Sequence, residues 1–222
     1  MSTDKFTEDS YEQTLIALFE QMGYQYECGY EVERDYSEPF HHVDLQKALR
    51  WLNPMMPDEV LEEAFRKVTT IKEGLLAQRN ETFTDYLQNG VEVEYLEDGS
   101  KKTELVKLMD FDCPNNNLWK VVNQWRVEDY EPIRCDMVVM VNGLPIVVIE
   151  LKSPSNDSVE ENDAYKQLQH YMQKCPSLFV FNAFCVTSDM LTTKAGTITA
   201  PEKRFMEWKT KDGNYESTAV AD

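Results

Sequence analysis

The chain has 222 residues, of which 42% are hydrophobic, and this is enough for one sizeable core. Its 22 Lys and Arg residues against 40 Asp and Glu residues give a formal net charge of −18, which argues against a free-standing nucleic-acid binder. No apolar run reaches the ~18–20 residues that a membrane span needs, so we expect no membrane partner.

The first part of the chain is predicted to be mainly helical. Apolar residues at helical spacing predict an amphipathic helix over residues 9–22, with Ser10 as the N-cap. A short helix is expected around residues 43–52. A longer helix is expected over about 58–79, with Asp58 as its N-cap.

From about residue 91 the apolar pattern changes to a period of two, which is typical of strands. "VEVEYLEDGS" alternates and ends in an Asp-Gly turn, and "LWKVVNQWRVE", "CDMVVMV" and "IVVIELK" follow as further strands. Helical spacing returns over residues 158–174, and "LFVFNAFCVTSD" predicts another buried strand. The tail, about 214–222, is small and polar, and we expect it to fray.

This order of elements predicts an α/β (α+β) fold with a central mixed β-sheet flanked by helices. We expect residues 1–222 to form a single domain, with helical elements in 1–90 and a core over about 91–213.

The strand "PIVVIELKSPS" carries an acid and a base, Glu150 and Lys152, two residues apart and therefore on one face. An Asn142-Gly143 hairpin turn precedes it. If the loop has two residues, Asp136 on the preceding strand faces Ile149. If it has three, Asp136 faces Glu150, because both index pairs then sum to 286.

Two carboxylates at cross-strand distance repel each other unless they are protonated or bridged by a cation. Carboxylate oxygens suit Mg²⁺, which polarises a phosphate and lowers the pKa of water, and a neighbouring ammonium such as that of Lys152 offsets charge growing on the phosphate. Asp136, Glu150 and Lys152 together therefore indicate a device for hydrolysing a phosphodiester. An E-x-K pair alone is more often a solvated strand end.

These residues match the PD-(D/E)xK nuclease motif. The wider pattern, "IRCDMVVMVNGLPIVVIELKSP", then "AYKQLQHY" and "RFMEWKTKDG", resembles the N-terminal nuclease domain of the R (HsdR) subunit of type I restriction enzymes. The A-x-x-Q-x-x-x-Y motif of that family is present with Gln167 and Tyr171, which lie on one helix face. Glu12 matches the acidic residue of the family's opening helix, which can approach the metal site.

The resemblance implies a restriction-endonuclease-like core and Mg²⁺-dependent cleavage of double-stranded DNA. Asp136 and Glu150 would hold the metal, with Glu12 as a further ligand, Lys152 would position the attacking water, and Gln167 and Tyr171 would support the site or contact DNA. Family partners are methyltransferase and specificity subunits and an ATP-driven motor of the same full-length chain. The sequence holds no G-x-x-x-x-G-K-[ST] phosphate loop, so we expect an N-terminal fragment of a cytoplasmic bacterial or archaeal subunit.

An alternative interpretation is a catalytically silent, nuclease-like module that docks to the motor or to other subunits. The complete Asp136, Glu150 and Lys152 set weighs against it, since a scaffold has no need of all three.

By count, residues 1–130 hold 13 basic and 27 acidic residues, a net of −14, and residues 131–222 hold 9 and 13, a net of −4. We therefore expect weak DNA binding and little cleavage by the chain in isolation.

Overall fold

The structure is a computed structural model that describes residues 7–152, 164–189 and 191–209. A mixed sheet of seven strands forms its centre, in the order β1-β4-β5-β6-β7-β8-β9. These strands are β1 (Gln25–Cys28), β4 (Trp119–Glu128), β5 (Pro132–Val141), β6 (Leu144–Leu151), β7 (Phe184–Ser188), β8 (Thr193–Gly196) and β9 (Met206–Glu207). β1 runs parallel to β4 and β6 runs parallel to β7, whereas the other pairs are antiparallel.

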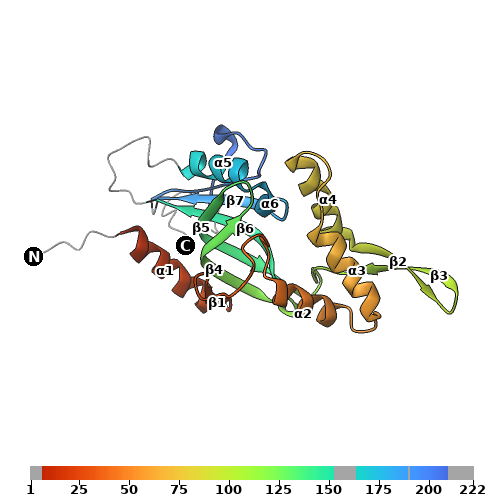
Figure 1. Ribbon diagram of the computed structural model, residues 1–222. Coiled ribbons are helices and arrows are strands. Elements are labelled where there is room, and N and C mark those ends of the chain that lie inside the picture. Colours follow the sequence, from red (N-terminus) through yellow and green to blue (C-terminus); the bar gives the residue numbers. More distant parts are fainter. Residues whose placement is uncertain (1–6, 153–163, 190, 210–222) are drawn as a thin grey trace, which may run out of the picture.

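Helices cover both faces of this sheet (Figure 1). On one face, α1 (Glu8–Gln21) packs Leu15 and Ile16 against apolar side chains of β4, β5, β6 and β7. On the other face, α5 (Ala164–Lys174) and α6 (Pro176–Phe179) pack Leu168 and Phe179 against the same strands. The predicted α/β architecture with a mixed, helix-flanked sheet is therefore confirmed.

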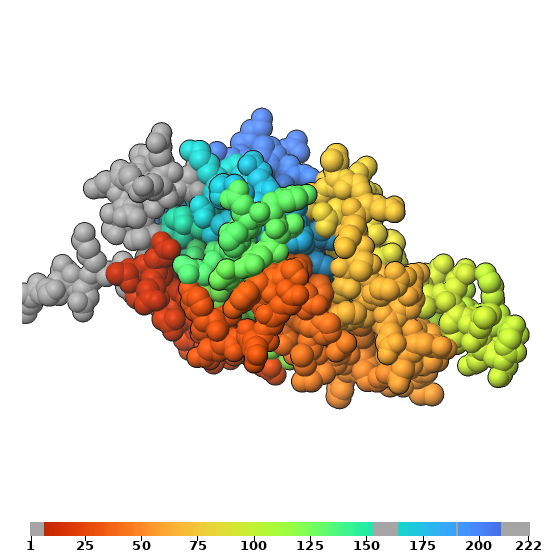
Figure 2. Space-filling view, viewed as in Figure 1, coloured from red at the N-terminus to blue at the C-terminus, as the bar shows by residue number. Residues whose placement is uncertain are grey.

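A second lobe lies beside the sheet. It contains α2 (His42–Leu52), α3 (Asp58–Thr69), α4 (Leu76–Asn89) and a separate hairpin of β2 (Val91–Glu97) and β3 (Ser100–Val106). These elements share one apolar cluster, and the hairpin projects beyond α3 and α4 (Figures 1 and 2). Sheet membership thus groups α1 and β1 with the seven-stranded sheet, and the β2–β3 hairpin with the helical lobe.

Two helix predictions need correction. The N-cap of α1 is Thr7, not Ser10, and Ser10 is the N3 residue of a reciprocal capping box with Thr7. The long helix expected over 58–79 is two helices, α3 and α4. Helix α3 ends at Thr69, and Gly74 in the connection to α4 adopts a φ of +89°. None of the helices that the structure describes is both long and apolar enough to cross a membrane.

Two further predictions are wrong in part. The segment "LFVFNAFCVTSD" begins as the short helix α6, and only Phe184–Ser188 forms a strand. The short strands β1, β8 and β9 carry too few apolar positions to show a period and were not predicted. The part of the predicted helix 158–174 before Ala164 and the tail 214–222 lie outside the described residues.

The hairpin between β5 and β6 has a two-residue loop, but farther along the strands it has the register expected from a three-residue loop. Val141 pairs with Leu144, so the loop is the two-residue one, and Asn142 and Gly143 have φ values of +55° and +81°, as a type I′ turn requires. The register then shifts by one, because Ile146 is left unpaired in a β-bulge. Beyond the bulge the paired indices sum to 286, which is the register expected from a three-residue loop.

The hairpin turn is buried against α2 and the loop before β4. The Asn142 side chain is 1% exposed; it accepts from the Leu118 N–H at 2.8 Å and donates to the Leu108 carbonyl at 2.9 Å. The Gly143 carbonyl accepts from the His41 N–H at 2.8 Å. Contacts from three directions therefore hold the turn in place.

Gly143→Ala should destabilise the fold by about 2–5 kcal/mol, because it adds left-handed strain and overpacks a buried turn. A Cβ at this position would lie 2.6 Å from the His41 carbonyl oxygen and the Leu45 nitrogen. Gly99→Ala is the matched control: Gly99 has a φ of +79° but nothing within 4 Å of its Cβ, so only the strain of about 1–2 kcal/mol remains. Urea unfolding measures both, and equal losses would contradict the packing argument.

Candidate active site

The candidate site lies where β5 and β6 separate. Their last paired residues at this end are Met137 and Ile149, and continuing that register by one position sets Asp136 opposite Glu150. There the ladder stops, and the Asp136 Oδ2 atom accepts the backbone N–H of Leu151 at 2.8 Å. A side-chain carboxylate thus takes the place of the next strand-to-strand hydrogen bond and opens a gap between the two strands.

Glu150 and Lys152 close the other side of the gap. The Lys152 Nζ atom lies 2.7 Å from the Glu150 Oε1 atom, and the Lys152 N–H donates to the Ser188 carbonyl at 2.8 Å. The Glu150 Oε2 atom is buried and has no hydrogen-bond partner among the residues that the structure describes. The structure therefore brings all three residues of the predicted site together, with one carboxylate oxygen of Glu150 unsatisfied.

Burial dominates the electrostatics of both carboxylates. It raises the pKa of Glu150 to about 8, the charge of Asp136 acts in the same direction, and Lys152 opposes them. Burial also raises the pKa of Asp136 to about 6, opposed by the Leu151 hydrogen bond and by Lys152. For Lys152, burial lowers the pKa, but Glu150 and Asp136 outweigh it and the net pKa is raised. These shifts keep the lysine charged and favour a proton or a cation at the Glu150 carboxyl group at neutral pH.

This arrangement fits a divalent cation. An unsatisfied, buried carboxylate oxygen is costly unless it meets a proton or a cation. Two neighbouring carboxyl groups whose pKa values are both raised favour the same partner, and oxygen donors are the ligands that Mg²⁺ prefers. Asp136 and Glu150 are the residues that would hold the metal.

Glu12 lies beside the site, but its carboxylate already accepts two side-chain hydrogen bonds. Its carboxylate is 6% exposed and accepts from the side chains of Asn123 and Gln124, both at 2.7 Å. Gln124 has a φ of +52° within β4, at the position between the partners of Met137 and Cys135, and so lies opposite Asp136. Glu12 thus stabilises a strained strand residue next to the site, and its role as a metal ligand stays a prediction.

Glu8 is a residue that the sequence reasoning missed. It lies one turn before Glu12 on α1, and its charge acts on Asp136 and Glu150, raising both pKa values, and on Lys152. The i, i+4 spacing of Glu8 and Glu12 places both on one helix face and was the signal that could have identified it. The N-cap assignment at Ser10 placed Glu8 outside the helix and hid this relation.

Gln167 and Tyr171 lie together on α5. The Tyr171 hydroxyl donates to the Arg134 carbonyl at 2.8 Å, and the side chain is 7% exposed. Burial raises the pKa of Tyr171, the charge of Glu150 acts in the same direction, and a hydrogen bond with Gln167 opposes them. Of the two roles considered for this pair, support of the site therefore fits better than contact with DNA.

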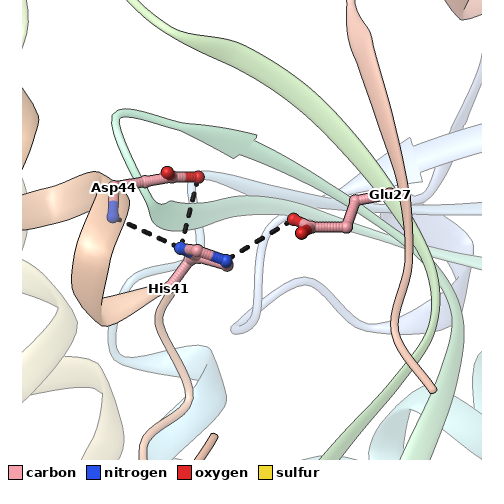
Figure 3. A group of neighbouring side chains, drawn as sticks. All are labelled: Glu27, His41 and Asp44. Carbon is pink, nitrogen blue, oxygen red and sulfur yellow. Dashed lines mark hydrogen bonds and ion pairs between the residues drawn. The ribbon is translucent and has the colours of Figure 1, made fainter. Parts of the chain in front are cut away.

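A second group of ligand-type side chains lies between β1, α2 and β4. Glu27, His41 and Asp44 have ligand atoms within 4.8 Å of one another and could hold a metal ion (Figure 3). The Lys120 ammonium, however, lies 2.7 Å from Glu27 Oε2 and 2.5 Å from Asp44 Oδ2. A lysine charge thus already neutralises this group, and a cation would have to displace it.

The chain is similar to known proteins over most of its length, and not only at the candidate site. The profile of the family described as type I restriction enzyme R protein N terminus matches residues 5–204. The type I restriction enzyme HindI endonuclease subunit of Haemophilus influenzae is 32% identical over 96% of the chain and 21% of that protein. The putative MjaIXP endonuclease subunit of Methanocaldococcus jannaschii is 34% identical over 89% of the chain and 20% of that protein. The chain thus spans about a fifth of the length of these relatives.

Without divalent cations, the folded state should lose stability as pH rises from about 5 to 8. Over this range the carboxyl groups of the unfolded chain, with pKa values near 4, are ionised, whereas Glu150 in the folded state still holds a proton. Glu150→Gln should remove most of this dependence, on the order of a few kcal/mol, and Glu92→Gln, at an exposed carboxylate, should not. Thermal unfolding across pH tests this; an unchanged slope in Glu150→Gln would contradict it.

Proposed function

This chain belongs to the family of type I restriction enzyme R protein N-terminal regions, and from that premise we propose that it is a Mg²⁺-dependent endonuclease domain. Its reaction is hydrolysis of phosphodiester bonds in double-stranded DNA, after ATP-driven translocation by a motor outside this chain. The partners on this proposal are the motor of the same full-length subunit and the methyltransferase and specificity subunits. The whole chain, residues 1–222, would act as one nuclease domain within that subunit.

The observation that carries the proposal is the unsatisfied Glu150 Oε2 atom within a cluster of Asp136, Glu150 and Lys152. A buried acceptor without a partner destabilises the fold, and a cation bound at Glu150 would remove that cost. The cluster also lies at the end of two strands that the bulged hairpin holds in register. Such rigid support suits a site that must position a reacting phosphate.

On this proposal, different residues of the site have different roles in hydrolysis. Water attacks the phosphorus atom and one backbone P–O bond breaks, which leaves a phosphate on one product and a hydroxyl on the other. The Lys152 ammonium, held by Glu150 while the Lys152 backbone N–H donates to the Ser188 carbonyl, orients the water and offsets the negative charge that develops on the phosphate. Asp136 and Glu150 would hold Mg²⁺, which would polarise the phosphate and make the water more acidic.

The remaining residues of the proposed site act through others. Tyr171 anchors α5 to the Arg134 carbonyl of β5, two residues before Asp136, and Gln167 is hydrogen-bonded to Tyr171. Glu12 holds Gln124 opposite Asp136. These contacts keep the backbone of β4, β5 and α5 in the positions that Asp136 and Glu150 need.

Lys152→Ala in the full-length subunit, assembled with its partner subunits, should reduce DNA cleavage by about 10²–10⁴-fold, because an ammonium no longer offsets charge on the phosphate. ATP hydrolysis and translocation should persist. Lys101→Ala, at an exposed lysine of the separate β2–β3 hairpin, is the control and should cleave normally. Unchanged cleavage by Lys152→Ala would refute the site and favour the alternative of a silent docking module.

The isolated chain should bind double-stranded DNA only weakly, with a Kd above about 10⁻⁶ M at physiological salt, because its net charge of −18 opposes a polyanion. Fluorescence anisotropy with a labelled duplex across a salt series measures this. Tight, salt-resistant binding would contradict the view that other parts of the complex deliver the DNA.

A further inference from the structure

A row of paired residues crosses the sheet beside the candidate site. Glu150 on β6 pairs with Thr187 on β7, Thr187 pairs with Lys194 on β8, and Lys194 pairs with Glu207 on β9. Directly paired residues project from the same face of a sheet. The row therefore extends the face that carries Glu150 across three further strands.

This is the face that α5 covers. Val148 and Cys185 form the pair two positions before Glu150 and Thr187, and both lie in the apolar cluster that packs against α5. Residues two apart in a strand share a face, so Glu150 and Thr187 point to the α5 side as well.

A cavity of about 350 Å³ opens on this side, next to the candidate site. Lys152, Thr187 and Lys194 line it together with polar side chains of the β7–β8 turn, and Tyr165 and Phe205 form an apolar wall. The lysine of the proposed reaction and a second lysine thus share one hollow. A polar cavity of this size accommodates a phosphate with part of its sugar.

Lys194 differs from Lys152 in its bonding. The Lys152 ammonium is held 2.7 Å from Glu150, whereas Lys194 is exposed and forms no ion pair with any residue in the described parts of the chain. Glu207 lies directly across the strand pair, yet it leaves the charge of Lys194 unpaired. In the same cavity, the Asp189 Oδ1 atom accepts the N–H groups of Leu191 and Thr192, and Glu202 is a further acidic residue of the lining.

We propose that Lys194, with the Thr187 hydroxyl as a second donor, binds a DNA phosphate next to the one that is cleaved. This inference rests on the proposed nuclease function and adds a subsite to it. An ammonium and a hydroxyl are donors that DNA-binding proteins use to fix the register of a phosphate backbone without reading its sequence. Lys194 is therefore a positioning residue, not a member of the reacting set.

The spacing of the sheet sets which phosphate is within reach. Lys194 is two strands from Glu150, about 10 Å away at roughly 4.8 Å per strand. One strand of B-DNA rises about 3.4 Å per nucleotide, so the bound phosphate lies within about three nucleotides of the cleaved one. The flexible stem of lysine shortens that span further.

The test uses the full-length subunit assembled with its partner subunits and supplied with plasmid DNA and ATP. Lys194→Ala should lower the cleavage rate about tenfold and reduce the slope of its logarithm against the logarithm of salt concentration by about one, since one phosphate contact is lost. Lys194→Arg should remain within about threefold of the unchanged complex, because the positive charge is kept. ATP hydrolysis, which reports on folding and assembly, should be unaffected in both variants.

Two controls separate this role from others. Lys101→Ala, at an exposed lysine on the distant β3 strand, should cleave normally with an unchanged salt slope. Glu207→Gln tests a merely structural role: if Lys194 acted only by attracting Glu207, this variant would reproduce the defect of Lys194→Ala, whereas phosphate binding predicts no loss of cleavage. That reproduction, or a normal rate and slope in Lys194→Ala, would overturn the subsite.

Lys152→Ala, measured in the same assay, keeps the two proposals apart. If Lys152→Ala abolishes cleavage while Lys194→Ala leaves the rate and the salt slope unchanged, the nuclease assignment stands and the phosphate subsite falls. If Lys152→Ala cleaves normally, the nuclease assignment falls and the subsite, which rests on it, falls too.

Discussion

The position of every residue in the candidate site depends on one extra residue in β6. Without the bulge at Ile146, the type I′ turn would set Asp136 opposite Ile149, and Glu150 would project from the other face of the sheet. With it, the pairs beyond Val139 and Val147 follow the register that sets Asp136 opposite Glu150. The Ile146 carbonyl, freed from β5, accepts the Ala183 N–H at 2.8 Å and so joins the bulge to the chain entering β7. The bulge therefore aligns three strands of the sheet at once.

That alignment brings together groups that destabilise one another. Burial raises the pKa values of both Asp136 and Glu150, the charge of Asp136 raises that of Glu150 further, and Lys152 compensates for only part of these effects. The surrounding contacts hold the carboxylates in place nonetheless: Leu151 donates to Asp136, and Tyr171 ties α5 to β5. A strained residue, Gln124, lies opposite Asp136 and is held by Glu12. Strain and unsatisfied polar atoms commonly collect at functional sites, where the rest of the fold over-determines the geometry.

The sequence predicted the central strands of the sheet, the three residues of the candidate site and the position of the hairpin turn, because each has a local signal: period-two apolar runs, an E-x-K strand end and an Asn-Gly pair. The sequence left the register of β5 and β6 open, because a bulge depends on how two strands pair and not on the sequence of one strand alone. Pro145 offered a hint, since a strand proline has no N–H and is often found at bulges. The break between α3 and α4 and the start of α1 at Thr7 were missed because alternative caps compete over a few residues. The short strands β1, β8 and β9 pair over only two to four residues each, so their existence depends on the sheet beside them rather than on their own sequence.

The distribution of charge explains how an acidic chain could act on a polyanion. On the proposed function, the DNA backbone must approach two buried carboxylates in a chain of net charge −18. Within the described part of the site, the cations on the face of Glu150 are Lys152, fixed by an ion pair, and Lys194, which is left unpaired. Two lysines and a bound divalent ion offset the local repulsion at one or two phosphates, but they do not supply the many phosphate contacts on which tight binding depends. Affinity would then reside in other parts of the assembly, and this domain would contribute the geometry of cleavage alone. On the proposed function, a nuclease that cannot hold DNA by itself would cut only where DNA is delivered to it, so weak binding would be a means of control and not a defect of the site.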